Sequence, residues 1–158
     1  MKKGLRKVLV IVGVSVLSLV LFLAWYMTSN GEIHLIPKNY EGVVVIVFNV
    51  ADGVPEKHED RKRVYEIPDN GILRTQFKFN DHWVASSYLQ YYYVSKSGER
   101  ERIPYPDRVE NLSSDVVQVF SKSAGDNASS PENPYIIYLV GKYEEADSLS
   151  RLKESFPF

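Results

Sequence analysis

Alternating apolar and polar positions between residues 31 and 105 predict a series of short β-strands. Residues 42–48 are a nearly continuous run of valine, isoleucine and phenylalanine, which is typical of a central strand covered on both faces. Residues 72–79 alternate instead, with Leu73 and Phe77 on one side and polar side chains between them, as in a half-buried strand. We therefore place the centre of the fold in this part of the chain.

Turn residues divide the rest of the chain into further short elements. Pro68-Asp69-Asn70-Gly71 and Ser95-Lys96-Ser97-Gly98 predict hairpin turns. The remaining predicted strands lie at 33–36, 63–67, 83–96, 99–103, 116–121 and 136–140, and residues 83–96 could form one long strand or two short ones. An exposed loop over 124–134 and a short helix over 144–154 are also predicted. Because no helical pattern separates the strands, the sequence predicts a mainly β fold, an antiparallel β-sandwich of about eight strands with a short C-terminal helix.

An uncharged run of twenty residues, 8–27, precedes these strands. As a helix it would be about 30 Å long, the thickness of a bilayer's hydrocarbon core. Basic residues precede the run and Trp25 and Tyr26 close it, which predicts a single-pass protein of the cell membrane with its N-terminus in the cytoplasm. The predicted organisation is a cytoplasmic basic segment (1–7), a transmembrane helix (8–27), a linker (28–31) and an extracytoplasmic β domain (32–158). A cleaved signal peptide is the alternative, with a site near Ser29-x-Gly31.

Composition excludes several classes of function. The chain has no cysteine, so disulfides, thiolate nucleophiles and a lipid-modified cysteine are ruled out. Four of the nineteen basic residues and none of the twenty acidic ones precede the apolar run, which leaves the rest of the chain with a net charge of −5. Nucleic-acid binding proteins usually carry the opposite sign, so we predict no nucleic-acid partner.

The residues that could carry catalysis or bind a metal do not have the spacing that such sites require. The histidines lie 24 residues apart without a close pair, no Gly-x-Ser-x-Gly motif is present, and the acidic pair alternates with arginines as on a solvated edge. We predict no catalytic residue, no metal site and no cofactor. The sets concerned are His34, His58 and His82 for a metal, Ser86 or Ser87 with His82 and Asp81 for a hydrolase, and Glu99 with Glu101 for a glycosidase.

The tyrosine-rich strand is the strongest binding candidate. Tyr88, Gln90 and Tyr92 share one of its faces, while Tyr91 and Tyr93 share the other. A tyrosine ring with its hydroxyl suits sugars, peptides or a partner protein, although such a row can also close a sandwich core. We predict Tyr88 and Tyr92 as a ligand or partner surface.

Two motifs mark the first half of the β domain: Ile36-Pro37-x-x-Tyr40-x-Gly42-x-Val44-x-Ile46 and Arg63-x-Tyr65-x-Ile67-Pro68-x-x-Gly71-Ile72-Leu73-x-Thr75-Gln76. With them the chain resembles an uncharacterised bacterial family of secreted or membrane-anchored domains of unknown function. The resemblance covers residues 32–105 and implies no catalytic residues. The opening motif is also similar to those of small transthyretin-like and regulatory β-sandwich modules.

These observations favour a non-enzymatic binding or interaction module of the cell envelope. Its expected partners are the lipid bilayer, through residues 8–27, and an envelope protein or glycan. Two alternatives remain open. A small envelope hydrolase or sugar-processing enzyme would be favoured by a concave pocket that contains histidines and acids. A structural or inhibitory subunit of an envelope complex would be favoured by an exposed apolar patch without a pocket.

Overall fold

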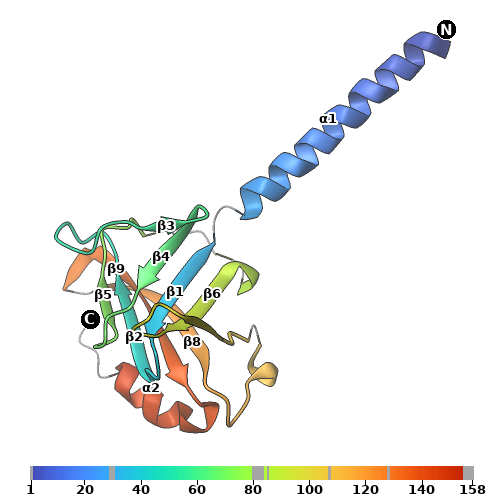
Figure 1. The fold of residues 1–158 in the computed structure, drawn as a ribbon. Coiled ribbons are helices and arrows are strands. Elements are labelled where there is room, and N and C mark those ends of the chain that lie inside the picture. Colours follow the sequence, from blue (N-terminus) through green and yellow to red (C-terminus); the bar gives the residue numbers. More distant parts are fainter. Residues whose placement is uncertain are drawn as a thin grey trace. The chain divides into compact units, whose positions relative to one another are not determined.

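The computed structural model describes residues 2–28, 31–79, 84, 86–106, 108–127 and 129–154. The chain forms two compact units, Met1–Asn30 and Gly31–Phe158. The first unit is helix α1 (Lys2–Thr28; Figure 1), on which apolar side chains from Val10 to Leu23 are exposed around the whole helix. Among the side chains that the structure describes, no helix combines the length and the apolar character needed to cross a membrane.

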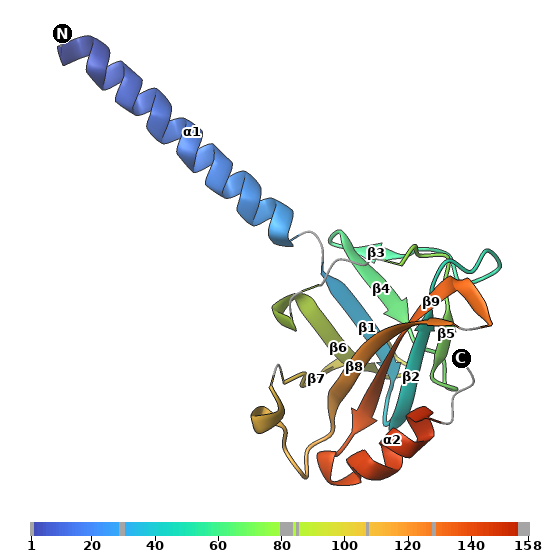
Figure 2. The ribbon, with the colours of Figure 1, turned by 180° about the vertical axis from the view of Figure 1, so that it is seen from behind.

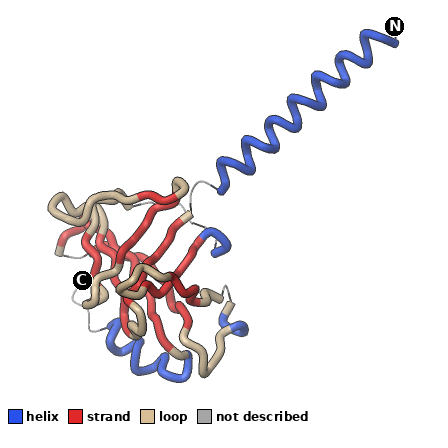
Figure 3. The backbone as a smooth tube through the Cα atoms, in the orientation of Figure 1, coloured by secondary structure: helices blue, strands red, loops and turns tan. Residues whose placement is uncertain are grey.

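Within its described residues, the second unit contains a five-stranded and a four-stranded sheet (Figure 3). The five-stranded sheet has the order β3 (His58–Glu59), β4 (Lys62–Glu66), β1 (Glu32–Pro37), β6 (Leu89–Val94) and β7 (Arg100–Ile103). The four-stranded sheet has the order β5 (Ile72–Arg74), β2 (Gly42–Val47), β9 (Ser130–Gly141) and β8 (Gln118–Asn127). The helical segments are η1 (Ser86–Tyr88), η2 (Val109–Asn111), η3 (Tyr143–Glu145) and α2 (Ala146–Glu154).

The main core lies between the two sheets. Tyr65 and Tyr91 come from the five-stranded sheet, and Val44, Ile46 and Tyr138 from the four-stranded one, and all five are buried in one cluster. As predicted, β2 is a central strand, and both of its faces are buried. Its second face packs under α2 (Figures 1 and 2) in a smaller apolar cluster.

The predicted antiparallel pairing is wrong for both neighbours of β1 and for one neighbour of β2, whereas β2 and β9 do pair antiparallel. β1 runs parallel to β4 and β6, and β2 runs parallel to β5. The reason is that the chain changes sheets after β1, β2, β4, β5 and β7, so it returns to its first sheet in the original direction. The turn at residues 68–71 therefore joins β4 to β5 across the two sheets and forms no hairpin. The fold is mainly β, with two mixed sheets and a C-terminal helix.

One predicted hairpin is confirmed, and one predicted loop is wrong. The hairpin of β6 and β7 is confirmed, with Tyr91 opposite Ile103. The loop predicted over 124–134 is wrong, because β8 continues to Asn127 and pairs there with Ser130 of β9. The exposed end of this hairpin is held by backbone pairing and little burial, so its polar sequence carries no strand pattern. The predicted alternation over 72–79 is retained: Leu73, Thr75 and Phe77 are buried.

Candidate functional site

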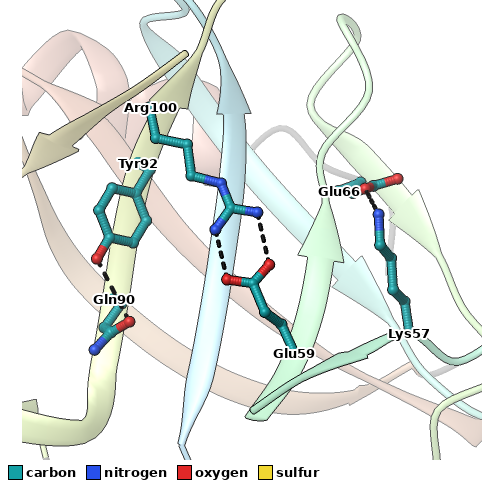
Figure 4. A network of polar contacts seen from close by, with 6 residues as sticks. All are labelled: Lys57, Glu59, Glu66, Gln90, Tyr92 and Arg100. Atoms are coloured by element: carbon teal, nitrogen blue, oxygen red, sulfur yellow. Dashed lines mark hydrogen bonds and ion pairs between the residues drawn. The ribbon is translucent and has the colours of Figure 1, made fainter. Parts of the chain in front are cut away.

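Within the predicted binding strand, Tyr91 and Tyr93 lie on one face of β6 and Tyr92 on the other. Tyr91 is 1 % exposed in the core, and Tyr93 packs against the same core and donates to the Tyr40 carbonyl at 2.7 Å. Tyr92 points to the outer face of the five-stranded sheet and is half-buried, and its hydroxyl donates to Gln90 Oε1 at 3.5 Å (Figure 4). Tyr88 is half-buried in η1, just before β6. Of the two predicted surface residues, Tyr92 therefore has the better defined setting.

An apolar cluster, the outer patch, lies on that outer face. Its buried members are Ile33 and Leu35 of β1 and Val64 of β4, which are 3–8 % exposed. Tyr92 and Val94 of β6 pack against them while remaining partly exposed. The parallel register brings these residues together, since it places Ile33 beside Val64 and Leu35 beside Tyr92. The members of the outer patch are thus Ile33, Leu35, Val64, Tyr92 and Val94.

Two ion pairs accompany the outer patch (Figure 4). Both terminal nitrogens of Arg100 donate to the carboxylate of Glu59, at 2.7 and 2.8 Å, and Lys57 binds Glu66 nearby. The hydrogen bonds from Arg100 lower the pKa of Glu59. The side chains of Arg100 and Glu59 are 34 % and 41 % exposed, so this bidentate contact is open to solvent and to other ligands.

A second polar group, the inner cluster, lies on the opposite side of β1, facing the core. It consists of Glu32, His34, Lys122 and Tyr138. His34 is fully buried, with Nε2 at 3.3 Å from Glu32 Oε2 and Nδ1 at 3.1 Å from the Tyr138 hydroxyl. The ammonium of Lys122 is also 3.3 Å from Glu32 Oε2. The ring of Tyr91 stacks on the imidazole at a centroid distance of 4.5 Å.

The protonation states of the inner cluster follow from these contacts. Burial opposes ionisation of Glu32, but the His34 hydrogen bond and the Lys122 charge outweigh it and lower its pKa to about 2. Burial lowers the pKa of His34, so the imidazole is neutral at pH 7. Nε2–H then donates to Glu32, and Nδ1 accepts from the Tyr138 hydroxyl. Because His34 and Tyr138 are both 0 % exposed, a substrate in solvent cannot reach these hydrogen-bonded side chains.

The other predicted sets are not assembled into a site by the described residues. His34 lies in the inner cluster, whereas the ring of His58 packs edge-on to Phe77, and the described residues form no group that could hold a metal. His82 and Asp81 lie outside the described residues, and Ser86 and Ser87 are exposed in η1.

The predicted acidic pair is also exposed. Glu99 lies just before β7, and Glu101, on that strand, is 4.0 Å from Lys38 Nζ. Both acids therefore occupy the solvated edge expected from the sequence.

A shallow hollow of about 540 Å³ lies elsewhere, at the loop that follows β2. Its lining consists of Asn49, Val50, Ala51, Gln76 and Lys78. It contains neither a histidine nor an acid, so it does not supply the pocket that the hydrolase alternative requires.

Sequence reasoning missed the pairing of Arg100 with Glu59 and the whole inner cluster. A signal for the inner cluster was available, because Glu32 and His34 alternate with Ile33 and Leu35. Because side chains alternate along a strand, either the polar or the aliphatic pair must face the core. No local signal joins Arg100 to Glu59, which lie 41 residues apart on different strands.

Comparison with known proteins places the chain in a family. The model of the family of unknown function DUF6843 matches residues 28–147. The chain belongs to this family. No curated protein matches the sequence. The fold is similar to a crystal structure named "Putative Lipoprotein from Bacillus anthracis", with 21 % identity and a TM-score of 0.54 over 80 % of this chain and 96 % of that one. At this identity the likeness concerns the DUF6843 fold alone.

Proposed function

We propose that this DUF6843 protein is a membrane-anchored, extracytoplasmic module without enzymatic activity, and that it binds an envelope partner through the outer patch. The observation that carries the proposal is the partly exposed edge of that patch, formed by Tyr92 and Val94 against buried aliphatic residues. Aromatic side chains and arginine beside an apolar centre are characteristic of protein interaction surfaces. Tyr88, half-buried just before β6, is included as a peripheral contact.

The proposed anchor is residues 8–27, with residues 1–7 in the cytoplasm. Its support is the absence of charge from this run and the basic residues before it. The envelope location also agrees with the word "lipoprotein" in the name of the structural neighbour, although this cysteine-free chain cannot carry a lipid on cysteine.

Topology can be tested with a C-terminal tag on the full-length protein. Protease added outside the cytoplasmic membrane should remove the tag while the protein stays in the membrane fraction. Release of a shortened chain into the soluble fraction would instead identify a cleaved signal peptide. Protection of the tag in right-side-out vesicles would refute the topology.

The binding face can be tested by site-specific photo-crosslinking in cells. A photoreactive phenylalanine analogue in place of Tyr92 should give a discrete product with one envelope partner. The matched control is Tyr143, which is 40 % exposed and packs on Phe120 of the other sheet. Equal products at both positions, or none at Tyr92, would remove the outer patch as the binding face.

Of the two alternatives, the structural or inhibitory subunit uses the same surface and differs only in what binding achieves. The crosslinked partner distinguishes them: an enzyme whose activity falls when the complex forms indicates inhibition.

A further inference from the structure

The pair of Arg100 and Glu59 connects opposite edges of the five-stranded sheet. Arg100 starts β7 at one edge and Glu59 ends β3 at the other, with β6, β1 and β4 between them. Neighbouring strands lie about 4.8 Å apart, so the edges of a flat sheet of this size would be about 19 Å apart. The two side chains still meet at 2.7 and 2.8 Å, both extended toward each other (Figure 4). The sheet is therefore far from flat, and the pair bridges its outer face.

This face carries an excess of positive charge on a domain that is acidic as a whole. Residues 8–158 have a net charge of −5, from fifteen basic and twenty acidic residues. Strand register and ion pairing bring more cations than carboxylates to the outer face. They are Lys57, Lys62, Arg100 and Arg102, against the carboxylates of Glu59 and Glu66. Arg100, Lys57 and Lys62 all act on the carboxylate of Glu59, and Lys57 also binds Glu66. Four cations thus face two carboxylates, which favours the binding of one more acidic group.

The chemistry beside Arg100 indicates what else such a ligand carries. Val94 pairs with Arg100 across the β6–β7 ladder, and Tyr92 pairs with Arg102. Four of the five outer-patch residues are aliphatic, which suits aliphatic side chains of a protein better than sugar rings, because sugars are usually held on aromatic platforms. The planar guanidinium, with two parallel N–H donors, matches a carboxylate in the bidentate geometry that Glu59 already shows.

We propose that Arg100 binds a carboxylate of a partner protein. In the absence of the partner, the carboxylate of Glu59 occupies this position. The partner segment presents an acidic side chain that displaces Glu59 and, next to it, an aliphatic side chain that lies on the partly exposed Tyr92 and Val94. This inference rests on the proposed function and adds the class of partner to it. Exchange is feasible because both side chains of the present pair are more than a third exposed, and such pairs hold a fold together only weakly.

The test uses the full-length protein in lipid nanodiscs and a displayed library of random twelve-residue peptides. Wild-type protein and Glu59→Gln should enrich peptides in which Asp or Glu neighbours Leu, Ile or Val. Glu59→Gln should bind them about two- to fivefold more tightly, since the competing carboxylate is gone. Arg100→Gln should weaken binding by about thirtyfold or more, as for an arginine at the centre of an interface. Arg100→Lys should fall between, because lysine keeps the charge and loses the bidentate fork.

A charge swap guards against a variant that fails to fold. The double variant Glu59→Arg with Arg100→Glu restores an ion pair across the face, and we expect it to lose the acidic peptides. Enrichment of peptides without acids, no enrichment, or binding that does not depend on Arg100 would overturn the inference. So would Arg100-dependent binding of phosphatidylglycerol vesicles in the absence of any peptide binding. A Tyr92 crosslink that persists in Arg100→Gln cells would refute this inference alone, whereas loss of the wild-type Tyr92 crosslink would refute the proposed function.

Discussion

Replacement of Lys122 by methionine tests whether the inner cluster is held together as the distances indicate. Lys122 Nζ lies 3.3 Å from Glu32 Oε2, and the two side chains are 17 % and 5 % exposed. The variant would leave the Glu32 carboxylate buried without the cation that balances its charge, while the His34 N–H still donates to it. Removing one member of a buried ion pair typically costs about 3–5 kcal/mol. Because Lys122 retains some contact with water, we expect a loss of about 3 kcal/mol of unfolding free energy at pH 7.

The pKa of Glu32 predicts how the stability contributed by the whole inner cluster depends on pH. Burial opposes ionisation, but His34 and Lys122 together lower the pKa from 4.5 to about 2. A pKa difference of about 2.5 between unfolded and folded states corresponds to about 3 kcal/mol. Since the folded-state pKa is the lower one, this stability is present above pH 4.5 and is lost as the pH falls toward 2. Burial also lowers the pKa of His34 from 6.5. This adds a second loss of stability, which begins as the pH falls below about 6.5.

Urea unfolding of residues 31–158, followed by far-ultraviolet circular dichroism at several pH values, measures both effects. Wild type and Lys122→Met should differ most at pH 7 and converge as the pH falls from 4.5 toward 2, the range in which ionised Glu32 ceases to stabilise the folded state. Lys142→Met is the control, because its pair with Glu144 spans 3.8 Å with both side chains at least 40 % exposed, and such pairs contribute at most about 1 kcal/mol. Equal losses in the two variants, or a difference that stays constant from pH 7 to pH 2, would refute the pairing.

Three further predictions concern the stability of the same fragment by the same assay. Tyr91→Phe should stabilise it by about 1 kcal/mol, because this buried hydroxyl has no hydrogen-bond partner among the described residues, whereas Tyr138→Phe should cost about 1 kcal/mol by removing the bond to the buried imidazole. Ile46→Ala should cost about 2–5 kcal/mol, and an unchanged midpoint would contradict its central position. Gly71→Ala should cost well over 2 kcal/mol, since φ is +77° and a Cβ there would lie 2.0 Å from a tyrosine hydroxyl. Gly98→Ala, with φ of +85° and open space around it, should cost only about 1–2 kcal/mol. Equal losses of stability in the Gly71 and Gly98 variants would show that the tyrosine moves away from the new methyl group at little cost.

The sequence was informative wherever burial of a strand follows a local pattern. The run at 42–48 became a fully buried central strand, and the alternation at 72–79 matched burial although the strand β5 itself ends at Arg74. Both outcomes follow from the period of two along a strand, which depends on neighbouring residues alone. The same holds for α2, where Leu149 faces the four-stranded sheet.

Strand direction and the candidate site could not be read in this way. A turn such as residues 68–71 can connect strands of one sheet or of two, and the choice depends on where β1 and β2 have already placed the sheets. The bidentate contact of Arg100 has the same origin, because it exists only once β3 and β7 become opposite edges of one sheet. Contacts of this kind depend on the topology of the whole domain, and the sequence did not predict the parallel pairs in that topology.

The first four residues of β1 reverse the usual arrangement of a strand. Glu32 and His34 face the core, while Ile33 and Leu35 face outward. Replacing a buried ion pair by apolar residues of similar size is often neutral or stabilising, and aliphatic residues on an outer face contribute little unless something covers them. The reversed pattern leaves the outer patch under half-buried neighbours and partly exposed ion pairs, and this is the surface that the proposed partner would cover.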